Sequence, residues 1–254
     1  MKPAPFEYAS PATLDEALAL VGDDSRPLAG GQSLVPMLNF RLARPARLVD
    51  LERVDGLAYL RADGDVLRIG AMTRHATIEH SPLVAERWPL LRQAVSLVGH
   101  AQIRSRGTVG GSVAHADPKA ELPVALAALD ARYHVRSASG ARTIAATDLA
   151  FGPLMTTLAP DELLVEIEVP ALPEGARTAF VERARTHGDF AFAGVAVVRA
   201  PGHAAVALLG AGPKPVRAPE IEAALVRGDA LPEPAVADDY QRALLAALIE
   251  RAIA

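Results

Sequence analysis

Apolar and polar residues alternate along the chain in short blocks, some with the two-residue period of strands and some with helical spacing. The first helix is predicted to begin after Thr13 and to end near Gly22, because Thr13 and Glu16 have the spacing of a capping box before an apolar run. A strand from Arg26 then runs into a glycine turn. Further strands are predicted at 47–51, 66–71, 132–137, 142–145 and 163–169.

Helical spacing of apolar residues predicts several more helices in the first half of the chain. Ser33 is placed to cap a helix that has Pro36 in its first turn. The polar, glycine-bearing stretch 99–112 is predicted to be a loop. The other helices are predicted at 77–88 with breaks at Pro82 and Pro89, at 90–98, and from Pro118 onward.

The pattern changes after a Pro- and Gly-containing linker at 171–175. Beyond it, three antiparallel strands are followed by two helices, the last of which has apolar residues on one face. The strands are predicted at 178–185, 191–200 and 204–209, and the helices at 219–226 and 239–253. We therefore expect a first unit at 1–54, a second at 55–171 and a C-terminal α+β domain at 172–254.

The composition narrows the possible functions. The 254 residues include no cysteine, which excludes disulfides, thiolate nucleophiles and iron–sulfur clusters ligated by this chain. With 26 Lys and Arg against 30 Asp and Glu, the chain has no basic surplus for nucleic acid. No apolar stretch reaches the roughly 18 residues of a membrane span, and the first residues lack the apolar core of a signal peptide. We expect a cytoplasmic globular protein.

Two glycine pairs are the first candidates for binding chemistry. One is A-G-G-Q-S at 29–33 and the other is G-T-V-G-G-S at 107–112. In such turns successive N–H groups form concave anion sites, and a following helix adds its positive end, so a diphosphate could bind. Neither spacing fits a Rossmann or P-loop fingerprint, and a single glycine pair is more often only a tight turn. A second signal is needed to prefer the binding interpretation.

That signal follows the second glycine pair. Asp117 and Glu121 come shortly after it, and their carboxylates could accept hydrogen bonds from sugar or ribityl hydroxyls. Taken without the glycines, Asp117 would cap a helix with Pro118 at its first position, and Glu121 would be an ordinary first-turn acid. Together with the glycines, the two acids favour a cofactor cradle.

Several strings, which together span nearly the whole chain, resemble the FAD-binding medium subunit of the molybdenum hydroxylases, the group of aerobic carbon monoxide dehydrogenase and xanthine dehydrogenase. They are A-G-G-Q-S-L-V-P-M-L-N-F-R at 29–41, G-A-M-T-R-H-A-T-I-E at 70–79, T-V-G-G-S-V-A-H-A-D-P-K-A-E-L-P at 108–123, L-V-E-I-E-V-P at 164–170 and R-T-H-G-D-F-A at 185–191. The resemblance implies an α+β fold, with a two-lobed PCMH-type FAD-binding domain followed by a three-stranded antiparallel sheet with helices.

The resemblance also implies which residues hold FAD, without a covalent bond. The first motif would wrap the pyrophosphate, and the second would complete the phosphate and ribityl contacts. An acid near 121 would bind sugar or ribityl hydroxyls, and Leu163 or Leu164 would approach the adenine or the isoalloxazine edge. The implied cofactor-binding residues are Ala29, Gly30, Gly31, Gln32, Ser33, Leu34, Thr108, Gly110, Gly111, Ser112, Asp117, Glu121, Leu164 and Phe190.

The chain departs from the family pattern beside the flavin ring. Many members have Tyr where this chain has Phe190, which can cover the ring but cannot donate a hydrogen bond. The xanthine dehydrogenase branch has a Lys where this chain has Val181. The redox tuning of the flavin and the identity of the final electron acceptor are therefore left open. A cysteine-bearing branch of the family is excluded, because the chain has no cysteine.

Other polar residues carry weaker signals. The seven histidines show no metal-binding spacing, so no metal site is predicted in this chain. His75 and His100 are interpreted as polar loop histidines rather than as covalent attachment points for FAD. Arg104 and Arg106, before the second glycine pair, are either solvated charges or phosphate or docking contacts.

The resemblance implies an electron-transfer subunit. A large partner chain would carry the molybdenum cofactor, a small partner chain would carry [2Fe–2S] clusters, and the FAD here would discharge to a quinone, oxygen or NAD. The resemblance also implies that two such three-chain units form a dimer. The alternative is a self-sufficient flavoenzyme of the UDP-N-acetylenolpyruvoylglucosamine reductase type, which would need its own proton donor over the flavin. A third possibility is a module that keeps the fold without FAD.

Overall fold

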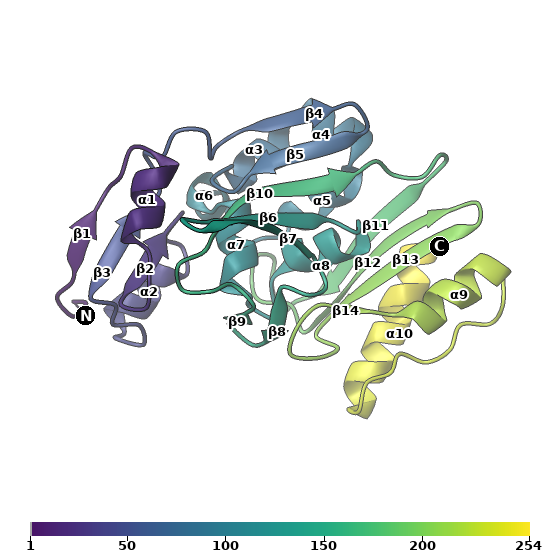
Figure 1. Cartoon of the computed structure of the whole chain (residues 1–254). Coiled ribbons are helices and arrows are strands. Elements are labelled where there is room, and N and C mark those ends of the chain that lie inside the picture. Colours follow the sequence, from purple (N-terminus) through teal and green to yellow (C-terminus); the bar gives the residue numbers. More distant parts are fainter. Residues whose placement is uncertain (1) are drawn as a thin grey trace.

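A computed structural model describes residues 2–254 and arranges them around three main sheets (Figure 1). The first sheet is small and parallel, with strand order β1-β3-β2. Parallel neighbours need crossover connections, and short helices supply them here. The elements are β1 Glu7–Ala9, α1 Leu14–Leu20, β2 Ser25–Leu28, α2 Leu34–Asn39 and β3 Arg47–Asp50.

The second sheet is antiparallel, with order β4-β5-β10-β6-β7, and it lies in the middle of the molecule (Figure 1). Apolar side chains of its strands share one core with five helices. The strands are β4 Leu60–Asp63, β5 Val66–Gly70, β6 Arg132–Ser137, β7 Gly140–Ala145 and β10 Leu163–Pro170. These five helices are α3 His75–His80, α4 Pro82–Arg87, α5 Pro89–Val95, α7 Val109–His115 and α8 Glu121–Ala128, and the further helix α6 Ala101–Arg106 adds no residue to this core.

The third sheet is antiparallel and is packed on both faces. Helices α5 and α8 cover one face, and α9 and α10 cover the other. Strand β12 is therefore a nearly continuous apolar run, as a strand buried on both sides requires. The strands are β11 Arg177–Arg183, β12 Ala193–Ala200, β13 His203–Leu209 and β14 Val216–Arg217, and the helices are α9 Pro219–Arg227 and α10 Asp239–Ile253. A small hairpin, β8 Ala150–Gly152 and β9 Met155–Thr156, completes the fold.

Most of the predicted elements are confirmed. Thr13 and Glu16 form the expected capping box on α1, the broken helix predicted at 77–88 is α3 and α4, and the helix predicted at 90–98 is α5. The C-terminal sheet has the three predicted strands and a fourth, two-residue strand, β14. Helix α8 begins at Glu121 rather than at Pro118, because 117–120 form a turn first.

The predicted loop at 99–112 is wrong. It contains two helices, α6 and α7, separated only by Gly107 and Thr108. Ala, Gln and Arg in α6 have good helix propensity, and Thr108 caps α7 with its side chain. The polar composition and the glycines of this stretch therefore gave no sign of two short helices that tertiary packing stabilises.

The three sheets lie within the three expected ranges, but their cores are not equally separate. The first unit packs in a small cluster around Ala17 and Val49 that also includes Leu57, Met72 and Leu163 of the second range. The second sheet and the inner face of the third share one large core that includes Leu126 and Val198. Within residues 2–254, no helix has the length and apolar character needed to cross a membrane.

Candidate functional site

The first glycine motif lies between β2 and α2. Gly31 has a φ of +74°, a conformation that glycine adopts without strain, and its carbonyl accepts from the Val35 amide at 3.0 Å. Ser33 occupies the N-cap position but makes no capping bond, contrary to the expected cap. Within the described chain, the amides from Gly31 to Leu34 make no hydrogen bond to protein. The loop therefore presents free N–H donors and a free hydroxyl.

The second glycine motif forms the start of α7. The Thr108 hydroxyl accepts from the Gly111 amide at 3.1 Å, and the Thr108 carbonyl accepts from the Ser112 amide at 3.0 Å. The amide of Gly110 donates to the Ala71 carbonyl at 2.9 Å. Because these amides already have partners, this motif is not the open anion nest that its sequence indicated.

The glycines of the two motifs allow the backbones to touch. A Cβ on Gly30 would lie 2.8 Å from Gly107 Cα and 2.9 Å from the Arg106 carbonyl carbon. A Cβ on Gly111 would lie 3.2 Å from the Ala29 Cβ. Carbon atoms in good contact are about 3.5–4.0 Å apart, so both positions exclude a larger residue. The structure thus brings together two motifs that are far apart in sequence.

His75 and Arg74 support the contact between the two motifs through bonds to the backbone of residues 106–108. The His75 amide donates to the Gly107 carbonyl at 2.9 Å, and His75 Nε2 lies 2.9 Å from the Thr108 carbonyl. Burial lowers the pKa of His75 to about 4, so the ring is neutral and Nε2–H donates. The Arg74 guanidinium bonds to both the Arg106 carbonyl and the Glu52 carboxylate, and so links the first unit to the second.

A surface hollow of about 430 Å³ opens over the first motif. Residues 28–32 form one side, with Val35 and Pro36 of α2, and Ile103 and Arg106 of α6 form the other, while Asp50 at the end of β3 also lines the hollow. The Asp50 carboxylate accepts from the Tyr8 hydroxyl and the Glu52 amide, and the exposed guanidinium of Arg106 and the free amides of the loop are the hydrogen-bond donors of the hollow. This chemistry suits an anionic group such as a diphosphate.

The other predicted site residues come later in the chain, in the second unit or beyond it. Asp117 lies in the turn after α7, where its carboxylate accepts from the Lys119 amide at 2.8 Å. Glu121 is buried at the start of α8. Leu164 lies in the core with only 6% of its surface exposed, so the structure places it behind the surface that a ligand would contact. Phe190, by contrast, is 66% exposed before β12 and free to cover a ligand.

Two sequence interpretations of charged residues are wrong. Arg104 is neither solvated nor a docking residue, because it is buried and bonds to the Glu79 carboxylate at 2.7 and 2.9 Å. This pair lowers the pKa of Glu79. His75 is not a polar loop histidine but a buried residue of α3. His100 is the exposed residue before α6.

Sequence reasoning missed residues whose roles depend on tertiary neighbours. Lys119 lies in the turn before α8 and donates to the Ala191 carbonyl at 3.0 Å. Glu182 on β11 has a buried carboxylate oxygen, Oε2, without a partner. The string at 70–79 contained His75 and Arg74, but no spacing rule marked them as supports for the second motif.

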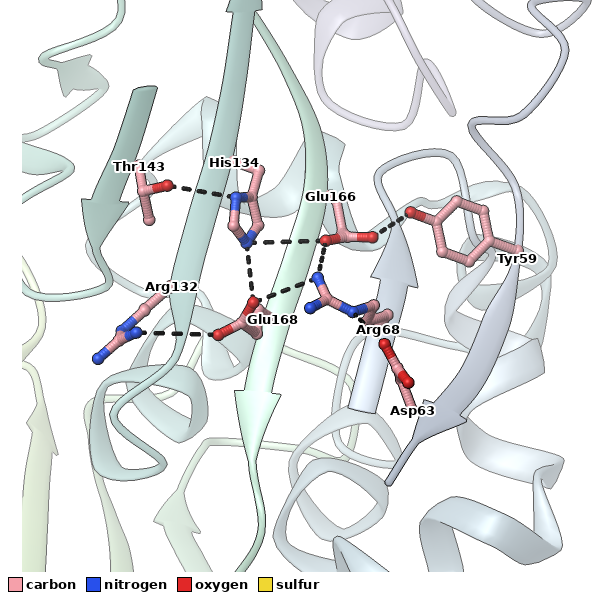
Figure 2. Close-up of polar contacts among 8 residues, drawn as sticks. All are labelled: Tyr59, Asp63, Arg68, Arg132, His134, Thr143, Glu166 and Glu168. Atoms are coloured by element: carbon pink, nitrogen blue, oxygen red, sulfur yellow. Dashed lines mark hydrogen bonds and ion pairs between the residues drawn. The ribbon is translucent and has the colours of Figure 1, made fainter. Parts of the chain in front are cut away.

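A separate polar cluster lies on the open face of the second sheet (Figure 2). His134 Nε2 is 3.1 Å from Glu168 Oε2 and 3.6 Å from Glu166 Oε1, and such atoms could ligate a metal. Arg68 already donates to Glu166 at 2.6 Å and lies 3.2 Å from Glu168. Burial alone would raise the pKa of Glu166, but the bonds from Tyr59 and Arg68 lower it. The carboxylates of this cluster are thus already paired with the Arg68 cation.

Known proteins resemble this chain over most of its sequence. The family of the FAD binding domain in molybdopterin dehydrogenase matches residues 4–172, which contain both glycine motifs. The nicotine 6-hydroxylase medium subunit of Paenarthrobacter nicotinovorans is 42% identical over 244 residues, covering 93% of this chain and 86% of the relative. The carbon monoxide dehydrogenase medium chain of Hydrogenophaga pseudoflava is 41% identical over 201 residues, covering 78% of this chain and 70% of the relative.

The whole fold also has a close counterpart among solved structures. The carbon monoxide dehydrogenase from Hydrogenophaga pseudoflava that lacks the Mo-pyranopterin moiety of its cofactor contains a chain that matches with a TM-score of 0.92. The identity is 37%, and the match covers 100% of this chain and 97% of that chain. Sequence, site geometry and fold therefore agree that this chain belongs to the family of FAD binding domains in molybdopterin dehydrogenases, as the FAD-binding medium subunit of a molybdenum hydroxylase complex.

Proposed function

We propose that this chain is the electron-transferring subunit of its complex, in which electrons from [2Fe–2S] clusters on a small partner chain reach FAD held here and leave to an external acceptor. Substrate oxidation would take place at a molybdenum centre on a large partner chain. We expect two such three-chain units to pair. Because this chain has no cysteine, any clusters that require thiolate ligands must lie on other chains.

The observation that supports the proposal most directly is the contact between the two glycine motifs. Gly30 fits against Arg106 and Gly107 with no room for a side chain, and the neighbouring loop keeps its amides free. These residues fit a dinucleotide, whose diphosphate would lie on the first motif beside Arg106. Bound FAD supplies the redox chemistry, and the residues of this chain bind and orient it.

The rest of the predicted site is proposed to continue along the same side of the chain. Ser112, Asp117 and Glu121 would approach the ribityl and sugar hydroxyls, and the exposed ring of Phe190 would cover the flavin. Relatives such as the caffeine dehydrogenase subunit beta of Pseudomonas sp. are named as parts of multi-subunit enzymes. This favours the complex over a self-sufficient reductase.

The proposal is tested on the complex purified from its native cells. We expect chains that contain molybdenum and iron–sulfur clusters to copurify with this one in equal amounts. The oxidised complex is then mixed anaerobically with a small amount of dithionite, and cluster and flavin absorbance are followed separately. The proposal predicts that cluster reduction is followed by flavin reduction. Clusters that stay reduced beside oxidised flavin would contradict it.

A further inference from the structure

Arg74, the residue before α3, is fixed to the second glycine motif by its backbone. It forms an isolated antiparallel bridge with Thr108, and next to that bridge the Val109 amide donates to the Thr73 carbonyl at 3.0 Å. The side chain of Arg74 therefore starts from a point that cannot move independently of the second motif.

On one side the guanidinium of Arg74 donates to the carbonyl of Arg106. This carbonyl ends α6 and, like the last carbonyls of any helix, has no partner inside the helix, so Arg74 supplies the donor that it needs. Its oxygen is also an atom against which Gly30 packs, too closely for a Cβ to fit between them. Arg74 thus holds the carbonyl on which the first glycine motif rests.

On the other side the guanidinium reaches the first unit, where Nη2 of Arg74 donates to both carboxylate oxygens of Glu52. Glu52 follows Leu51, whose amide donates to the Leu28 carbonyl at 2.9 Å. Leu28 is the last residue of β2, and the first glycine motif begins at the next residue, Ala29. One side chain therefore joins the strand ends that carry the first motif to the backbone that carries the second.

This link has no equivalent elsewhere between the two units. Among residues 2–254, the Arg74–Glu52 pair is the only ion pair or side-chain hydrogen bond that joins residues 2–54 to the remainder of the chain. The rest of the contact between the units is apolar packing and backbone contact. Apolar packing has no preferred direction, whereas a charged hydrogen bond fixes the distance and angle between its groups.

The exposure of the pair indicates that it places the units rather than holds the fold together. The side chains of Arg74 and Glu52 are 21% and 42% exposed, and ion pairs that solvent reaches contribute little to the free energy of unfolding. Arg74 is also not among the residues that line the hollow over the first motif, where Arg106 is the cation. Its effect on a bound ligand would therefore be indirect.

We propose that Arg74 is a positioning residue for FAD: by bonding to Glu52 and to the Arg106 carbonyl, it holds the two glycine motifs at the spacing that the cofactor requires. A guanidinium suits this task, because its planar fork presents donors to two acceptors that lie in different directions. The inference rests on the proposed function, because it takes the diphosphate of FAD to lie on the first motif beside Arg106.

The test compares the FAD affinity of full-length variants by titration calorimetry. Arg74→Met keeps most of the length of the side chain without its donors and should weaken binding about 10-fold to 100-fold. Glu52→Gln should weaken binding about threefold to tenfold. It removes a negative charge from the neighbourhood of an anionic cofactor, so charge alone would tighten binding. Weaker binding in Glu52→Gln therefore distinguishes positioning from simple attraction between charges.

The two substitutions should not add, because both residues act through one contact. The double variant should bind FAD within about twofold of Arg74→Met. Glu7→Gln is the matched control, since the Glu7 carboxylate pairs with Arg47 at 2.8 Å inside the first unit, and it should stay within about twofold of the wild type. Unchanged or tighter binding in Glu52→Gln, or full additivity in the double variant, would overturn the proposal.

A second readout measures the spacing of the two units and needs no cofactor. Because the chain has no cysteine, Asp23→Cys in the first unit and Ala138→Cys in the second, both at exposed positions, take nitroxide labels without background. Pulsed electron double resonance should give a narrow distance distribution in the wild-type background and a broader one with Arg74→Met, at unchanged circular dichroism. Equal widths would overturn the proposal. Failure of the wild type to bind FAD would instead overturn the proposed function.

Discussion

Replacing Gly30 tests the contact between the two motifs most sharply. In Gly30→Ala the new Cβ would lie 2.8 Å from Gly107 Cα and 2.9 Å from the Arg106 carbonyl carbon, at least about 0.6 Å inside good carbon–carbon contact. Both neighbours are backbone, so the two motifs must move apart. Overpacking of this kind costs roughly 1–3 kcal/mol.

That cost should appear mainly as lost FAD affinity. In the free variant the motifs can relax apart, but FAD needs them at their original spacing, so binding must restore the strain. At about 1.4 kcal/mol per factor of ten, the expected loss is about 5-fold to 150-fold. Gly30→Val should lose more. Affinity is measured by calorimetry on protein whose circular dichroism matches the wild type.

Gly22→Ala is the matched control, because a Cβ there meets nothing within 4 Å and the backbone φ is ordinary. It should bind FAD within about twofold of the wild type, as surface substitutions away from special features do. If Gly30→Ala bound FAD as tightly as Gly22→Ala, the contact between the motifs would have no part in cofactor binding.

Three further predictions concern the supports of the site. Thr108→Ala removes the cap that accepts from the Gly111 amide and should lower the free energy of unfolding by about 0.5–2 kcal/mol in urea titrations; an unchanged midpoint would show the cap to be dispensable. Glu79→Gln leaves the buried Arg104 without its carboxylate and should cost roughly 3 kcal/mol by the same assay, whereas a loss below about 1 kcal/mol would mean that solvent replaces the pair. His75, whose pKa falls to about 4 on folding, binds its proton more readily in the unfolded chain, so stability is complete above about pH 6.5 and falls toward pH 4. Thermal melts of His75→Gln should fall less over that range, and parallel curves for the two proteins would refute this assignment.

Local sequence patterns correctly predicted the helices and strands whose ends are set by residues within the same element. The capping box of Thr13 and Glu16 and the prolines at 82 and 89 act within one or two turns, so spacing alone indicated the helix ends. The apolar run at 191–200 likewise indicated a strand, and the structure shows β12 there, buried on both faces.

Helices α6 and α7 were missed because distant partners stabilise them. Buried Arg104 of α6 depends on the Glu79 carboxylate, which lies in α3. Gly110 of α7 would be a poor helix residue in isolation, but a Cβ there would lie 2.5 Å from the Ala71 Cβ, so packing requires glycine. Neither contact has a signature in the local sequence.

The candidate site likewise has features that the sequence could predict and features that depend on tertiary neighbours. The sequence itself pointed to the two glycine motifs and Glu121, resemblance to a family implied FAD as their ligand, and the structure shows that the motifs touch. The open anion nest was predicted for both motifs, but only the first keeps its amides free, because Thr108 and Ala71 use those of the second. Glu182 could not be found from sequence, because the burial of its carboxyl depends on how β11 packs against α5 and α10.

A structure of this chain with FAD bound would test the central claim most directly. The account predicts the diphosphate within hydrogen-bond distance of the amides of residues 31–34, beside Arg106, with the ribityl chain running toward Glu121 and the flavin near Phe190. A diphosphate bound away from the first glycine motif, with the Gly30–Gly107 contact bare, would contradict it.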